Sequence, residues 1–420
     1  MARRRATSNS TTSNPVASNP VASNPVASNP EPAPAVLAGS DLRGIVGLVQ
    51  GATAGVLTIT EGVHQSVRST LALSSGAEPD RAGGLTGRIY AALRGFNAGV
   101  GHGLQGALGL LEQRLLRAPQ AEPHPVRLAL LSALNGVLGD RLQAERNPLA
   151  LAMQLRIGGM PFDEAVLGPA DSLRPHVLVL IHGLCMNDLQ WASSADRGHG
   201  EALAAALGCT PIYLRYNSGL SIAQNGIALA HALQHLQARW PLPLQRISLL
   251  GHSMGGLIAR SAELHARQLD MSWRSQLRDL LLLGTPNLGA PLERAGYGID
   301  QLLGSLPYAR HFARLGQMRS AGITDLRHGH LSADASPVAL PADLGCYAVA
   351  GVLAKRRSPM SERLLGDGLV PLHSALGTGE SGGPALDIPE HRTQVLYGTG
   401  HLDLLRSPAA RQRMIDWLRD

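Results

Sequence analysis

The fold of this 420-residue chain is decided by the stretch Ile247-Ser248-Leu249-Leu250-Gly251-His252-Ser253-Met254-Gly255-Gly256-Leu257-Ile258-Ala259-Arg260. It begins with a short apolar run typical of a strand, turns through a Gly-x-Ser-x-Gly sequence, and continues as a helix. Gly251 and Gly255 flank the turn, where strand and helix pass so closely that a Cβ would clash. This context is that of the nucleophile elbow, a strained turn that exposes the oxygen of its serine. Ser253 is therefore the candidate nucleophile.

Strands and helices alternate from Arg174 to the end of the chain. The run from Val177 to Ile181 is wholly apolar, which is typical of a strand buried on both faces of a parallel sheet. Further strands are expected at 211–215, 247–250, 280–283, 347–352 and 394–396, and helices at 201–207, 222–239 and 409–418. This alternation predicts a doubly wound, mostly parallel α/β sheet with right-handed crossovers.

The chain divides into three regions. Residues 1–38 repeat Ser-Asn-Pro-Val-Ala, and their apolar content is too thin to offset the entropy of ordering, which predicts a disordered low-complexity tail. Residues 39–165 form a helical N-terminal region that ends in a helix at 126–147 and an edge strand or extended lead-in at 151–161. Residues 166–420 form the α/β domain, with a helical cap inserted at about 290–343, where the strand pattern lapses.

Two uncharged runs in the N-terminal region, Gly44–Thr60 and Gly95–Leu111, carry glycines four residues apart. Small residues at this spacing let helices approach closely, as in pairs of membrane helices. Each run falls short of the ~20 residues that span a bilayer. A soluble or interfacial helical module is favoured over membrane association and over true spans. The region could also begin with a helix capped by Asp41.

Charge and composition exclude some classes of function. The net charge is +6, aromatic residues make up 3%, and the basic runs are confined to Arg3–Arg5 and Lys355–Arg357. This leaves no stacking surface for bases, so no nucleic-acid partner is expected. A pI near 9.6 is compatible with weak attraction to an anionic membrane surface, so peripheral membrane contact through the N-terminal helices is kept as an alternative.

The three cysteines, Cys185, Cys209 and Cys346, are odd in number and widely spaced. They form neither a disulfide framework nor a metal site, which favours buried thiols in a reducing compartment. Arg3–Arg5 is not followed by an apolar segment, so no cleavable signal peptide is expected. We therefore expect a cytoplasmic protein with no metal and no cofactor, and membrane association is kept as the alternative.

A serine becomes a nucleophile when a neighbouring base takes its proton, and the base is oriented by a third group. In folds with this elbow the chain order is serine, acid, histidine. Asp367 lies in the loop Gly366–Pro371 after a strand, where ligand chemistry gathers in open α/β sheets, and is the candidate acid. Asp387 and Asp403 are alternatives, whereas Asp279 precedes a strand.

The candidate base is His401, which follows the last strand in a glycine-flanked loop. His373 is the alternative, and His391 precedes that strand. The backbone amides of Met254 and Leu184 are the expected donors to the developing oxyanion, because one follows the nucleophile and the other lies in the loop after strand 177–181.

Two other histidines, His182 and His252, lie near these positions and are interpreted as structural hydrogen-bonding residues.

These motifs together resemble the α/β-hydrolase lipase/esterase superfamily from about Pro175 to Asp420, in particular the triacylglycerol lipases and the GPI inositol-deacylase-like hydrolases. The resemblance is carried by Leu180-Ile181-His182-Gly183-Leu184, Gly251-His252-Ser253-Met254-Gly255-Gly256, Leu283-Gly284-Thr285-Pro286-Asn287-Leu288-Gly289, Gly366-Asp367-Gly368-Leu369-Val370 and Gly400-His401. The Gly-Thr-Pro-x-x-Gly loop is typical of lipase-like members. The resemblance implies an α/β-hydrolase fold and hydrolysis of carboxylic esters, small-molecule or lipid, through an acyl-serine intermediate without a cofactor.

The sequence leaves three alternatives. An amphipathic cap over the nucleophile would suit a lipid-like or aryl ester, or it could merely close the surface of the domain. The same triad would serve an acyltransferase that uses an alcohol in place of water. A membrane-associated scaffold with a vestigial hydrolase domain is the rival from another class; such domains commonly lose a triad member, and none is missing here.

Overall fold

The computed structural model describes residues 41, 43–48, 125–165, 173–192, 198–290, 320–334, 336, 338–356, 366–379 and 385–419. The predictions for the tail 1–38, for the run Gly95–Leu111 and for most of the run Gly44–Thr60 lie outside the described residues. The same holds for the first part of the cap, 291–319.

The described residues form one eight-stranded sheet with the order β2-β1-β4-β3-β5-β6-β7-β8. Its strands are β1 (Gln154–Ile157), β2 (Met160–Pro161), β3 (His176–Ile181), β4 (Thr210–Arg215), β5 (Arg246–His252), β6 (Leu277–Leu283), β7 (Gly345–Val352) and β8 (Thr393–Tyr397). All pairings from β4 through β3 to β8 are parallel, and β1 pairs antiparallel with both β2 and β4. The lead-in expected at 151–161 is thus a short hairpin on the sheet edge. The mostly parallel sheet is that of an α/β-hydrolase fold, as the sequence predicted.

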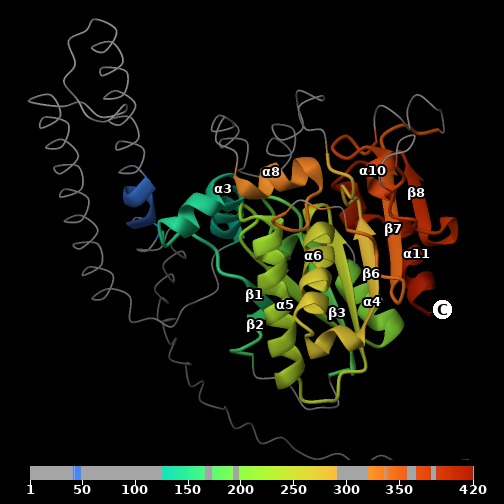
Figure 1. Ribbon diagram of the computed structural model, residues 1–420, viewed down its shortest axis with the longest axis horizontal. Helices are drawn as coiled ribbons and strands as arrows, with labels where there is room; N and C mark the ends of the chain where they lie inside the picture. The colour runs from blue at the N-terminus through green and yellow to red at the C-terminus, as the bar shows by residue number, and fades with distance from the viewer. Residues whose placement is uncertain are drawn as a thin grey trace, which may run out of the picture. The chain divides into compact units, whose positions relative to one another are not determined.

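Helices cover both faces of this sheet. They are α3 (Pro125–Ala144), α4 (His199–Leu207), α5 (Ile222–Arg239), α6 (Met254–Gln268), α8 (Ala321–His328), α10 (Leu372–Leu376) and α11 (Pro408–Arg419), with 3₁₀ turns η2 (Asp188–Trp191), η3 (Ser272–Gln276), η6 (Glu390–Arg392) and η7 (Asp403–Arg406). Figure 1 shows α5 and α6 in front of the sheet and α4 and α11 behind it. The strands β3, β5 and β6 are therefore enclosed on both sides, which explains their apolar runs, the longest being Val177–Ile181 and Leu280–Leu283.

The core joins the sheet to helix α3, which the sequence placed in the N-terminal region. Leu134, Val137, Leu138 and Leu142 of α3 belong to the same buried cluster as the side chains of β3 and β5. Asp41, expected to cap a helix, is itself helical, and its carboxylate accepts hydrogen bonds of 2.6 and 2.7 Å from the Arg127 guanidinium of α3. Within the described ranges, α3 is therefore packed as part of the α/β domain.

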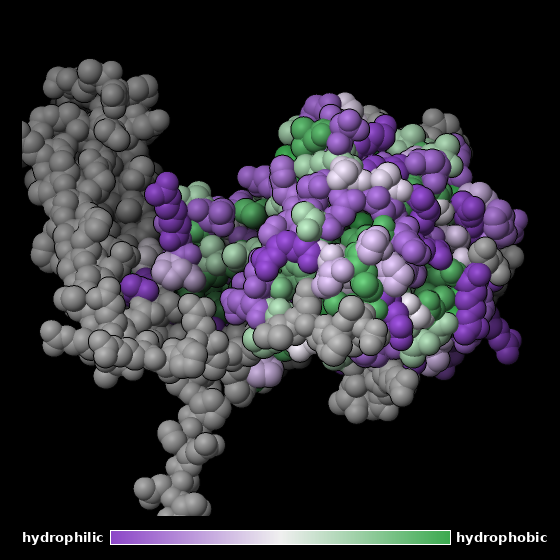
Figure 2. Space-filling view, turned by 90° about the horizontal axis from the view of Figure 1, so that it is seen from below, coloured by the Kyte–Doolittle hydropathy of each residue, from purple (hydrophilic) through white to green (hydrophobic). Residues whose placement is uncertain are grey.

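The described surface carries no continuous apolar band on the side seen from below in Figure 2, where hydrophobic residues form small islands among hydrophilic ones. Such islands are ordinary on protein surfaces. Among the described helices, none is both long enough and apolar enough to cross a bilayer. Cys185, Cys209 and Cys346 are free and buried, as expected from their spacing.

Candidate active site

The turn between β5 and α6 holds Ser253 in a strained backbone conformation, with φ 54° and ψ −126°. A residue with a side chain rarely adopts a positive φ, and it persists only where the surroundings enforce it. A Cβ on Gly255 would overlap the carbonyl oxygen of Ile181, and one on Gly251 would overlap the backbone of Gly256. The turn therefore has the elbow geometry that the sequence predicted, and both flanking glycines are required by close backbone contacts.

The loops after β7 and β8 bring Asp367 and His401 into contact. Nδ1 of His401 donates a hydrogen bond of 2.7 Å to Oδ2 of Asp367, and both side chains are buried. The other carboxylate oxygen, Oδ1, accepts from the backbone N–H groups of Leu369 and Val370 at 3.0 and 2.8 Å. The acid is thus held by its own loop, and the orientation of the imidazole is set by the acid.

His401 also lies beside the elbow, through the residue that precedes the serine. Nε2 of His252 donates to the backbone carbonyl of His401 at 3.1 Å, and the two ring centroids are 4.8 Å apart. Among the described residues, neither the Ser253 hydroxyl nor Nε2 of His401 forms a hydrogen bond with another protein group. In ligand-free enzymes such bonds are often long and tighten only with substrate. The structure thus brings the three predicted residues to one edge of the sheet, and their action as a triad stays a prediction.

The alternative acids have other partners. Oδ2 of Asp403 accepts the Gly400 N–H at 2.9 Å and so shapes the turn before His401. Asp279 lies at the amino end of the sheet, where Oδ2 binds Arg246 and Ser248. Asp367 is therefore the candidate acid that contacts His401 in the described part of the chain.

The remaining alternatives lie elsewhere. Asp387 precedes η6, and His373 lies in α10. His391 lies before β8, and its carbonyl accepts from Trp417. None of the three has a hydrogen bond with Asp367 or His401 in the described residues.

The two expected oxyanion donors lie in segments next to Ser253 in space or in the chain. Gly183 packs against the elbow so closely that a Cβ there would lie 3.1 Å from Cβ of Ser253, and Leu184 is the next residue. The Leu184 amide donates no hydrogen bond within the described residues. Met254 is the first residue of α6, where an amide has no acceptor within the helix and the helix dipole favours negative charge. Their role as donors to an oxyanion stays a prediction.

Three buried histidines around the site are neutral donors to backbone carbonyls. Nδ1 of His182 donates to Gly183 at 2.9 Å, and Nε2 of His199 donates to Leu404 at 2.8 Å. Burial lowers the pKa of both imidazoles to about 4, and it holds the pKa of His252 well below its usual range. A carbonyl can only accept, so these contacts also define which nitrogen carries the proton. The geometry agrees with the structural interpretation of His182 and His252.

The pKa of His199 makes stability depend on pH. Between its ordinary pKa of 6.5 and about 4, the unfolded chain binds a proton at this residue and the folded chain does not, so stability is lost as the pH falls through this window. His199→Gln keeps a donor for the Leu404 carbonyl and cannot titrate. As the pH falls, we expect the free energy of unfolding of H199Q to fall less steeply than that of the parent protein. The difference between the two slopes is expected to reach about 1.4 kcal/mol per pH unit. Urea unfolding from pH 7.5 to 4.5 measures this, with the exposed His231→Gln as control; equal slopes for H199Q and the parent would contradict it.

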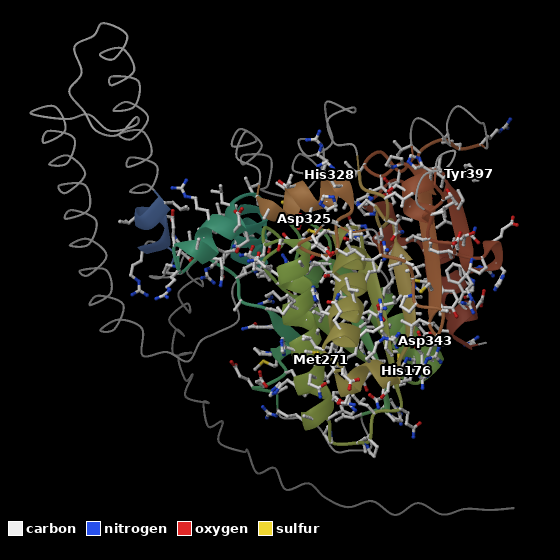
Figure 3. The ribbon with its side chains drawn as sticks, viewed as in Figure 1. His176, Met271, Asp325, His328, Asp343 and Tyr397 are labelled. Carbon is white, nitrogen blue, oxygen red and sulfur yellow. The ribbon has the colours of Figure 1, made fainter. Side chains whose placement is uncertain are left out.

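A second serine, histidine and aspartate meet at the opposite end of the sheet, and sequence reasoning did not identify them. Ser248 Oγ donates to Asp279 at 2.6 Å, so Nε2 of His176 must be the donor in its 2.9 Å contact with the same hydroxyl. Figure 3 shows His176 at the lower end of the sheet, where the strands begin. A base must accept the serine proton, and this imidazole already carries a proton on that side. The cluster therefore ties β3, β5 and β6 together and is not nucleophilic.

Within the described ranges, no group of three or more His, Cys, Asp or Glu side chains is arranged to hold a metal ion.

The sequence model of the PGAP1-like alpha/beta domain family matches residues 173–329. Among solved structures, a mature lipase from Bacillus licheniformis matches with a TM-score of 0.36 and 15% identity, covering 57% of this chain and 91% of the lipase. A Pyrobaculum calidifontis esterase has a TM-score of 0.37 and 15% identity, covering 59% and 75% of the two chains. The type II thioesterase of the borrelidin biosynthetic cluster matches with a TM-score of 0.37 and 16% identity, covering 63% of this chain and 96% of the thioesterase. No curated protein matches the chain.

Proposed function

We propose that this α/β-hydrolase domain, PGAP1-like over residues 173–329, hydrolyses carboxylic esters with Ser253 as the nucleophile. One observation carries the proposal: the buried 2.7 Å hydrogen bond between His401 and Asp367, next to the strained turn that holds Ser253. A carboxylate on Nδ1 keeps the lone pair of the imidazole on Nε2, which is the nitrogen that must take the serine proton. It also stabilises the imidazolium that forms during the reaction.

The proposed reaction has two halves. His401 Nε2 takes the proton of Ser253 as Oγ attacks the ester carbonyl carbon, and the resulting oxyanion binds the amides of Leu184 and Met254. The tetrahedral intermediate expels the alcohol, which receives the proton from His401. Water then attacks the acyl-serine with His401 again as base, releasing the carboxylic acid and regenerating Ser253.

The substrate is proposed to be a small-molecule or lipid ester, with peripheral membrane contact through the N-terminal region and a cytoplasmic location. Rates on p-nitrophenyl esters of increasing chain length, with and without anionic vesicles, test both the acyl preference and the membrane contact. An acyltransferase would use the same residues with an alcohol in place of water; adding a short alcohol and analysing the products separates the two.

A fluorophosphonate probe tests the function directly. Such probes phosphonylate an activated serine and leave ordinary hydroxyls unmodified, so we expect one modified peptide containing Ser253. Mass spectrometry of the digested, labelled protein locates the modification, and heat-denatured protein serves as the unreactive control. Folded protein that takes no label, or takes it at another serine, would rule out this proposal and favour a scaffold with an inactive hydrolase domain.

A further inference from the structure

Helix α3 lies outside the family-matched residues 173–329, yet it contacts the loop that carries the Leu184 amide. Figure 1 shows α3 next to α8, at the end of the sheet where α10 also lies. The helix is buried on most of its circumference, including two polar residues, Ser132 and Asn135. Buried polar groups need partners, and those of α3 are found in the helix itself, in a loop of the α/β domain and in the segment after α3.

The first contact is between α3 and Cys185, the neighbour of Leu184. A Cβ on Gly136 would overlap Sγ of Cys185 and would lie 3.0 Å from its Cα and its backbone nitrogen. Only glycine therefore allows the helix backbone to approach the loop this closely. Cys185 itself has a φ of 59°, a conformation that costs a non-glycine residue energy and persists only where packing enforces it.

A second contact holds the far side of the same loop. Nδ2 of Asn187 donates to Oγ of Ser132 at 3.2 Å, while that hydroxyl donates to the Leu128 carbonyl at 2.7 Å. The side chain of Asn187 also caps η2, and the next residue, Asp188, binds the Arg215 guanidinium at 2.6 and 3.0 Å. The loop is thus anchored to α3 and to β4 at the point where it leaves the site.

The connection between β4 and α5 completes the arrangement. The backbone N–H of Cys185 donates to Oγ of Ser218 at 3.0 Å, and Nδ2 of Asn217 donates to the Gly139 carbonyl of α3 at 2.9 Å. Cys185 is therefore held between α3 and this connection. The helix also receives a hydrogen bond of 2.7 Å at the Gly136 carbonyl from Ser320, at the start of α8.

We propose that α3 is a positioning element of the oxyanion hole, in which the contact of Gly136 with Cys185 sets the direction of the Leu184 amide. Leu184 lies between Gly183, which packs on Ser253, and Cys185, which packs on α3, so a shift of Cys185 turns the intervening amide. Donors to an oxyanion act only when they are already aimed at it. This inference rests on the proposed ester hydrolysis and adds a residue outside the matched domain.

Gly136→Ala tests the contact. Because the oxyanion forms only in the transition state, we expect kcat to fall about 10²-fold with KM changed less than about 3-fold. The second substitution Cys185→Gly removes Sγ, which is the closest contact, and suits a positive φ, so the double variant is expected to recover part of the lost kcat. Gln143→Gly, at an exposed position of the same helix, is the matched control: it weakens the helix and is expected to keep the parent kcat.

Ser132→Ala is the second variant, for the case in which Gly136→Ala does not fold. It removes the acceptor of Asn187 and is expected to lower kcat about 3- to 10-fold, again without a matching change in KM. Two results would overturn the proposal. One is an equal kcat in the parent, Gly136→Ala and Ser132→Ala. The other is a kcat that falls only in proportion to the melting temperature, as in Gln143→Gly, and that Cys185→Gly does not restore.

Alkylation of Cys185 reports on the loop without any activity. In a Cys209→Ala/Cys346→Ala background Cys185 is the remaining thiol, and we expect iodoacetamide to modify it at least several-fold faster after Gly136→Ala. Unchanged alkylation overturns the role of α3 even where kcat falls. If the parent protein neither hydrolyses esters nor reacts with the fluorophosphonate, the proposed function is wrong, and the oxyanion role is wrong with it. If the parent is active and Gly136→Ala has the same kcat, only the positioning role is wrong.

Discussion

Ser253→Ala is expected to lower kcat on a short p-nitrophenyl ester by about 10⁴- to 10⁶-fold, because it removes the oxygen that is proposed to carry the acyl group. The alanine leaves the positive φ of the turn in place and removes one oxygen, so the fold should persist. Steady-state hydrolysis of p-nitrophenyl acetate or butyrate, followed by the absorbance of the released p-nitrophenolate, measures the change in kcat. Fluorophosphonate labelling should disappear in the same variant.

Ser248→Ala is the matched control. Ser248 lies on β5, the strand that leads to Ser253, and is fully buried. Its substitution also removes a hydroxyl, but that hydroxyl bonds to Asp279 and His176 at the other end of β5. We expect its melting temperature to fall and its kcat to stay close to that of the parent. If Ser253→Ala retained the parent rate while Ser248→Ala lost it, the nucleophile would have been assigned to the wrong end of the sheet.

Asp367→Asn is expected to lower kcat by about 10⁴-fold with little change in KM. The amide oxygen can still accept the N–H groups of Leu369 and Val370, which bind Oδ1 in the parent. Its NH₂ group then faces Nδ1 of His401 and can only donate there, so the imidazole must carry its proton on Nε2. In that tautomer His401 cannot take the serine proton. The rate should recover in part at high pH, where hydroxide can replace the base, and a pH–rate profile measures this.

Asp403→Asn is the control for the loss of kcat expected in Asp367→Asn. Asp403 lies two residues after the histidine and accepts the Gly400 N–H, which an asparagine oxygen can also accept. We expect less than a 10-fold loss of kcat, because the orientation of His401 comes from Asp367. A larger loss in Asp403→Asn than in Asp367→Asn would reverse the assignment of the acid.

The elbow and the central strands could be predicted from residues close together in the chain. Gly251 is required because the strand and the helix touch one another within a few residues, whereas Gly255 is required because α6 passes close to the carbonyl of Ile181 at the end of β3. β3 is apolar from Val177 to Ile181 because helices cover both its faces. The bounds of α5 were predicted as Ile222–Arg239, and the structure has the same bounds. Pro241, shortly after its end, is a local signal. These features depend on backbone sterics and burial, which the pattern of residues in a short stretch of sequence indicates.

Two further features depended on where distant segments meet. Asp367, Asp387 and Asp403 were all plausible acids, and the choice among them follows from the parallel pairing of β7 with β8, which places residue 367 next to residue 401. The contact of α3 with Cys185 had no sequence signal, because Gly136 in an apolar helix resembles any small core residue. Hydrogen bonds and close contacts between segments far apart in the chain arise only when the core assembles, and the orientation of the proposed catalytic groups is determined at that step.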